Sequence, residues 1–115
     1  MTFELVDLEE LGEKALQDFN QALVAGQSGP AQTFEAAVRN LVSKVEFTYA
    51  VAAKLAHREP TVEGTAAIWA KMVAICDQIS VQVKSLEREH PGRTACFDRI
   101  LDLRNAAERR RELHS

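Results

Sequence analysis

The sequence predicts an all-α fold, an antiparallel up-down-up-down four-helix bundle, and three observations support this prediction. Glycine and proline gather at three places, residues 26–30, 60–64 and 91–92, and divide the 115-residue chain into four long segments. In each segment the apolar residues recur at steps of three and four, which is the period of an α-helix. The connections are short, and short connections make consecutive helices antiparallel neighbours. A chain of this length forms one domain around one core.

The first two helices are expected over residues 3–25 and 31–57. Gly26 is a typical residue to follow a helix, and Pro30 suits the start of the next one. Pro60 ends the second helix because its ring disfavours helical backbone at the preceding residue. The inward residues of the second helix repeat with the alternating steps of a coiled-coil seam. They are Phe34, Val38, Leu41, Val45, Thr48, Ala52 and Leu55.

The third and fourth helices are expected over residues 62–89 and 94–113, the third capped by Thr61 or a neighbour. The inward residues of the third helix are Trp69, Met72, Cys76, Ile79, Val83 and Leu86. Further apolar residues lie off this seam, so the third helix has to be covered on more than one side. Among them, Ile68, Ile75 and Val81 are expected to form the face of a homodimer.

The overall charge limits the classes of function. The formal net charge is −3, which argues against a dedicated nucleic-acid-binding protein because binding to phosphates needs a basic surface. The first residues are acidic from Glu4 onward, unlike the basic start of a signal peptide, and we expect a cytoplasmic protein. The most apolar stretch, residues 66–83, contains Lys71 and Asp77, so that no membrane span is predicted.

The first and last segments differ in charge. Residues 1–25 hold six acids and one lysine, whereas residues 93–115 hold six arginines and four acids. In the expected bundle the first helix lies against the last, and Arg109, Arg110 and Arg111 then pair with acids of the first helix. Those acids are Asp7, Glu9, Glu10 and Glu13. The alternative is that the three arginines form a basic patch that serves a partner.

The sequence contains no convincing arrangement for catalysis or for metal binding. Cys76 and Cys96 would differ in height along the bundle by roughly 15 Å, so both are predicted to be core thiols rather than a disulfide. Glu87-x-x-His90 has the spacing of a di-iron ligand pair, but the second pair that such bundles need does not occur. No phosphate-binding loop or nucleophile motif is present. We therefore expect no metal, no cofactor and no enzymatic activity.

Two segments resemble a known family. The run from Lys44 to Leu55, KVEFTYAVAAKL, is similar to the FEFT(F/Y)ELAWKL helix of the nucleotidyltransferase substrate-binding proteins, small members of the HEPN superfamily. The run from Phe97 to Asn105, FDRILDLRN, resembles that family's W-L-x-M-L-x-D-R-N segment. Together they cover about a fifth of the chain, and the third helix shows no likeness to the family.

This resemblance implies a four-helix bundle, a homodimer and a minimal nucleotidyltransferase as partner. Nuclease members of the superfamily use an Arg-Asn-x-x-x-His element across their dimer interface. Arg104 and Asn105 match its first two positions, but Arg109 stands where the histidine belongs. Arg109-x4-His114 offers another spacing, with Arg110 in place of the small polar residue that usually follows the arginine. The resemblance therefore implies a degenerate ribonuclease element.

Two main classes of function follow, and a third, an RNA-binding accessory, rests on the run of Arg109, Arg110 and Arg111 alone. The first is a non-enzymatic helical-bundle protein that acts through protein–protein contacts, as a homodimer built on the third helix. The alternative is a HEPN-like accessory of a nucleotidyltransferase, of the toxin–antitoxin type, with Arg104, Asn105, Arg109 and His114 as its site.

Overall fold

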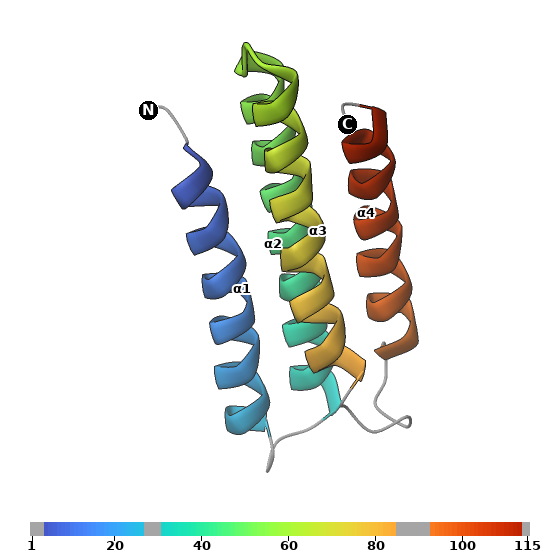
Figure 1. Cartoon of the computed structure of the whole chain (residues 1–115). Coiled ribbons are helices and arrows are strands. Elements are labelled where there is room, and N and C mark those ends of the chain that lie inside the picture. Colours follow the sequence, from blue (N-terminus) through green and yellow to red (C-terminus); the bar gives the residue numbers. More distant parts are fainter. Residues whose placement is uncertain (1–3, 27–30, 85–92, 114–115) are drawn as a thin grey trace.

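Four helices of alternating direction make up the chain in a computed structural model, which describes residues 4–26, 31–84 and 93–113 (Figure 1). They are α1 (Leu5–Gly26), α2 (Ala31–Arg58), α3 (Val62–Lys84) and α4 (Arg93–Leu113). No strand occurs within these ranges. The predicted antiparallel four-helix bundle is thereby confirmed. The predicted end of the third helix at residue 89, the turn at 91–92 and His114 lie outside the described residues.

Side-chain caps begin two of the helices. At the start of α1 the backbone N–H of Glu4 donates to Asp7 Oδ2 at 2.7 Å, which is the acidic half of a capping box. At the start of α3 the backbone N–H of Gly64 donates to Thr61 Oγ1 at 2.9 Å, as predicted for Thr61. Each cap satisfies a backbone N–H that has no partner within its helix.

The four helices are arranged as a rhombus when viewed along the bundle. The α2–α3 pair forms the short diagonal, and each of these helices also contacts both α1 and α4. α1 and α4 lie on opposite sides of this pair and, within the described ranges, do not contact each other (Figure 1). The expectation that the first helix lies against the last is therefore wrong. The arrangement instead gives α3, the most apolar helix, three neighbours to cover it.

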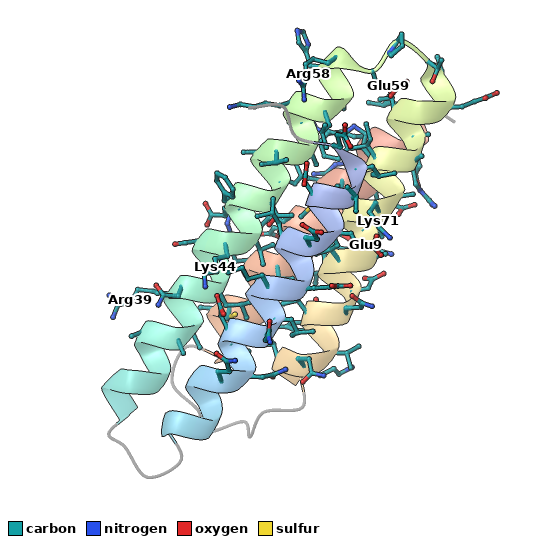
Figure 2. The ribbon with its side chains drawn as sticks, turned by 90° about the vertical axis from the view of Figure 1, so that its left-hand side faces the viewer. Glu9, Arg39, Lys44, Arg58, Glu59 and Lys71 are labelled. Carbon is teal, nitrogen blue, oxygen red and sulfur yellow. The ribbon has the colours of Figure 1, made fainter. Side chains whose placement is uncertain are left out.

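One ion pair spans each edge of the rhombus in the described part of the chain. α1 contributes the acid of both its pairs, and α4 contributes the base of both its pairs. The pairs are Asp18–Lys44 at 2.5 Å, Glu9–Lys71 at 2.9 Å, Arg99–Glu46 at 3.5 Å and Arg104–Asp77 at 3.1 Å. α2 and α3 thus each present a lysine to α1 and an acid to α4. Figure 2 shows Lys44 and Lys71 on the two sides of α1. Exposed pairs contribute little energy each, but this pattern favours the observed positions of α1 and α4 over exchanged ones.

The predicted pairing of the three consecutive arginines with the acids of α1 is also wrong, because α4 does not reach α1. Arg111 pairs with Glu108 on its own helix. Glu9, one of the expected partners, pairs with Lys71 instead.

The core follows the predicted seams. The buried members of these seams are Val38, Leu41, Val45, Ala52 and Leu55 of α2 and Trp69, Met72, Cys76, Ile79 and Val83 of α3. The core also contains Leu8, Ala15 and Phe19 of α1 and Cys96, Ile100, Leu103 and Ala107 of α4. Thr48, the polar member of the α2 seam, is also buried, and its hydroxyl donates to the backbone carbonyl of Lys44 at 2.7 Å. That hydrogen bond offsets the cost of burying a hydroxyl.

At Gly12, helix α1 lies directly against Ile75 of α3. A Cβ at this position would lie 2.8 Å from Ile75 Cγ2, so an added methyl group would collide with a buried, branched side chain. In Gly12→Ala this overpacking outweighs the gain in helix propensity, and we expect a net loss of about 1 kcal/mol in the free energy of unfolding.

The reference for this prediction is the same substitution made in an Ile75→Ala background. There the collision is absent, and Gly12→Ala is expected to stabilise the chain by about 1 kcal/mol through helix propensity alone. Urea unfolding of the four proteins measures both values. The close contact is contradicted if Gly12→Ala is equally stabilising in both backgrounds.

Candidate functional site

The outward side of α3 carries a seam of small apolar residues. Ala67, Ala74 and Val81 are exposed and seven residues apart, which places them on one face of the helix, and Ala70 on the same side is half-buried. We call these four residues the outer seam. The Glu9–Lys71 pair borders it toward α1, and the Arg104–Asp77 pair borders it toward α4. The charges beside the seam are thus partnered within the chain.

The structure places the predicted dimer residues differently from one another. Ile68 and Ile75 are only 6% and 5% exposed, whereas Val81 is 66% exposed. Two of the three therefore belong to the core of the chain and cannot form a free face. The physical reason is that α1 packs against the side of α3 that carries Ile75, with Gly12 in contact.

A groove of about 930 Å³ runs between α1 and α3, next to the outer seam. It lies toward the C-terminal ends of these parallel helices, beyond the Glu9–Lys71 contact that Figure 2 shows. Leu16 and Val81 supply its apolar lining, and Glu13 supplies a charge. The remaining lining residues are amides: Gln17, Asn20, Gln21, Gln78 and Gln82. Sequence reasoning missed this groove because it arises only when α1 lies beside α3.

The three arginines predicted as a basic patch point in different directions. Arg109 is exposed, and Arg111 pairs with Glu108. Arg110 reaches across to two other helices: its Nε donates to the hydroxyl of Tyr49 at 3.0 Å, and its Cζ lies 5.2 Å from the ring centroid of Trp69. Successive helical residues diverge by about 100°, so a run of three does not form one surface.

Arg110, Tyr49 and Trp69 form a cluster that sequence reasoning missed. The Tyr49 and Trp69 rings pack at 5.2 Å between centroids with 50° between their planes, a tilted aromatic contact. The three residues come from α4, α2 and α3, so no local pattern links them. The available signal was weak: the chain has a single tryptophan and a single tyrosine, and both lie in amphipathic segments.

The residues of the degenerate ribonuclease element are brought together only in part. Arg104 and Asn105 are adjacent, and Arg104 Nη1 donates to Asn105 Oδ1 at 3.4 Å. Arg104 Nε also donates to Asp77, which occupies its guanidinium in an ion pair. Arg109 is exposed just over one turn further along α4, and His114 lies outside the described residues. The HEPN-like function stays a prediction.

Both cysteines are free and buried, as predicted. Burial raises the pKa of the Cys76 thiol to about 12 and that of the Cys96 thiol to about 11. At neutral pH both are therefore protonated and poor nucleophiles. Within the described ranges, histidine, cysteine and acidic side chains form no group of three that could hold a metal ion.

Helix α3 is long and apolar enough, by length and composition alone, to cross a membrane, with a mean hydropathy of 1.2 in its most apolar window. The central helix of a bundle meets the same criterion. In this chain α3 packs against three other helices and carries two charged side chains in ion pairs, Lys71 and Asp77.

Comparison of the chain with protein-family models, with curated proteins and with solved structures finds no match. Its function is therefore inferred from its own residues and their arrangement.

Proposed function

We propose that this chain is a non-enzymatic helical-bundle protein that acts through protein–protein contacts, as a homodimer joined along the outer seam of α3. The observation that carries the proposal is the exposed apolar seam on the helix that is already the most apolar in the chain. Small residues allow a second helix to approach closely, and the bordering charges need no partner from another molecule.

The spacing of the seam favours an antiparallel pairing of two α3 helices about Ala74. Ala67 and Val81 lie seven residues before and after Ala74. A twofold axis at Ala74 therefore sets the Val81 of each protomer against the partner's small Ala67, so that a large side chain meets a small one at both ends. Such an interface is isologous, and each protomer contributes the same surface.

The interface buries little apolar surface, so we expect a weak dimer. Burying an exposed valine contributes roughly 1.5 to 3 kcal/mol, and association has to overcome the loss of translational and rotational freedom. Light scattering at tens of micromolar protein is expected to detect the dimer. Val81→Glu places a charge in the seam without touching the core, and a folded monomer is expected.

Cysteine cross-linking tests the antiparallel arrangement directly. Ala74→Cys places the new thiol at the axis, where two copies come close enough to form a disulfide on mild oxidation. Ala67→Cys is the matched control. In an antiparallel pair its two copies are separated by the rise of fourteen helical residues, which is roughly 20 Å. The native cysteines are buried and do not compete.

Covalent dimer from Ala74→Cys but not from Ala67→Cys is the expected outcome. Equal cross-linking at both positions would indicate a parallel pair instead. If neither variant cross-links and the natural chain is monomeric at tens of micromolar, the homodimer is excluded.

A further inference from the structure

A pocket of about 440 Å³ lies at the end of the bundle where the α2–α3 hairpin extends past α4 (Figure 1). Ala53 and Ala56 of α2 and Val62 of α3 supply small apolar walls. Trp69 and Arg110 also line it, so the arginine–aromatic cluster faces this pocket. The pocket thus combines small apolar walls with the polar groups of His57, Thr61 and Thr65 and with the guanidinium of Arg110. Apolar walls with a few polar groups that fix orientation are typical of a site for a small ligand.

The guanidinium of Arg110 is held in place by neutral groups. Tyr49 accepts the Nε hydrogen bond, and the Trp69 ring lies beneath the cation at 5.2 Å. Neither contact uses the two η nitrogens. Their N–H groups form the edge of an arginine that binds a carboxylate through two parallel hydrogen bonds. Holding the arginine in advance lowers the entropy lost when a ligand binds.

Arg110 differs in this respect from other arginines of α4. Arg99, Arg104 and Arg111 each pair with a carboxylate of the chain. In the described ranges Arg110 has no carboxylate partner. Glu59 also lines the pocket, but its Oε1 accepts hydrogen bonds from the backbone N–H of Thr61 at 3.3 Å and from the Thr61 hydroxyl at 2.9 Å. That carboxylate is therefore engaged at the start of α3.

We propose that this pocket binds a carboxylate attached to an apolar group, with the carboxylate on the η nitrogens of Arg110 and the apolar group against Ala53 and Ala56 of α2 and Val62 of α3. A small organic acid and the C-terminus of a peptide that ends in an apolar residue share this chemistry. The site is separate from the outer seam and does not depend on dimerisation.

Trp69, the single tryptophan, makes the proposal measurable by fluorescence. The full chain is titrated with cyclohexanecarboxylate, which is expected to change the Trp69 emission saturably with a Kd of about 1 mM. Cyclohexanecarboxamide has the same shape without the charge and is expected to bind at least about tenfold more weakly. The peptide acetyl-Ala-Ala-Leu, with a free or an amidated C-terminus, forms the second arm. The arm with the tighter carboxylate-dependent binding identifies the source of the group.

Two arginine variants provide the matched control. Arg110→Gln is expected to weaken carboxylate binding by about tenfold or more, whereas Arg109→Gln, with the same change of charge one residue away, stays within about twofold. Circular dichroism verifies that both variants are folded.

Ala53→Leu fills the pocket and is expected to abolish binding without changing the charge. The proposal is overturned if acid and amide bind equally, if Arg109→Gln weakens binding as much as Arg110→Gln, or if neither carboxylate arm gives a saturable change.

Discussion

An Ile75→Glu variant is expected to be largely unfolded at neutral pH. Ile75 is 5% exposed and packs against Gly12 of α1, so a glutamate there either buries an ionised carboxylate or separates α1 from α3. The lost isoleucine packing alone costs about 2 to 5 kcal/mol, and the buried charge adds several more. A domain of this size has a total stability of about 5 to 15 kcal/mol. Circular dichroism and urea unfolding measure the loss of helix.

Val81→Glu is the matched control, since it makes the same type of substitution six residues further along α3. Val81 is 66% exposed, and the variant is expected to keep its helical signal and to unfold within about 0.5 kcal/mol of the natural chain at monomer concentrations. If the Ile75→Glu protein is instead folded and monomeric, Ile75 belongs to an exposed dimer interface and not to the core. The pair of variants thus separates the core side of α3 from its outward side.

The secondary structure and the core could be predicted because both depend on local patterns. The steps from Val38 through Leu41 to Val45 fix which side of α2 faces inward, whatever the other helices do. Thr48 keeps its place in that seam because its hydroxyl bonds within its own helix. The start of α2 after Pro30 and its end before Pro60 followed from proline for the same reason.

The order of helices around the bundle could not be predicted from the summed charge of each segment. Arg99 and Arg104 of α4 point toward α2 and α3, where Glu46 and Asp77 meet them. The exposed Asp98, just before Arg99, and Asp102, between the two arginines in sequence, lie on other sides of the helix. The net positive charge of α4 therefore does not indicate which helix lies beside it. The attraction of α4 to α1 was inferred from arginines that pair with acids of α2 and α3 instead.

The candidate sites depend on contacts that only the assembled bundle provides. Counting apolar residues correctly indicated that α3 needs more than one cover, but not that α1 is the cover for Ile75. Likewise, nothing in the run of three arginines distinguishes Arg110 from its neighbours. Its role follows from Tyr49 and Trp69, which lie 61 and 41 positions away in the chain.

Raising the pH from 7 to 10 is expected to lower the free energy of unfolding by about 3 kcal/mol through the two cysteines alone. Burial raises the pKa of Cys76 from 9.0 to about 12 and that of Cys96 from 9.0 to about 11, so both stay protonated in the folded chain at pH 10. In the unfolded chain both ionise near pH 9, which favours unfolding by about 1.4 kcal/mol for each thiol at pH 10. The stabilising contribution of the two thiols to the free energy of unfolding is complete below pH 8 and is lost as the pH rises toward 12. Urea unfolding under reducing conditions is compared with that of a Cys76→Ala, Cys96→Ala double variant, which differs from the natural chain only in these two thiols. Parallel pH profiles for the two proteins would contradict the burial of these thiols, whereas a natural chain that loses about 3 kcal/mol more than the variant between pH 7 and pH 10 places both within the core.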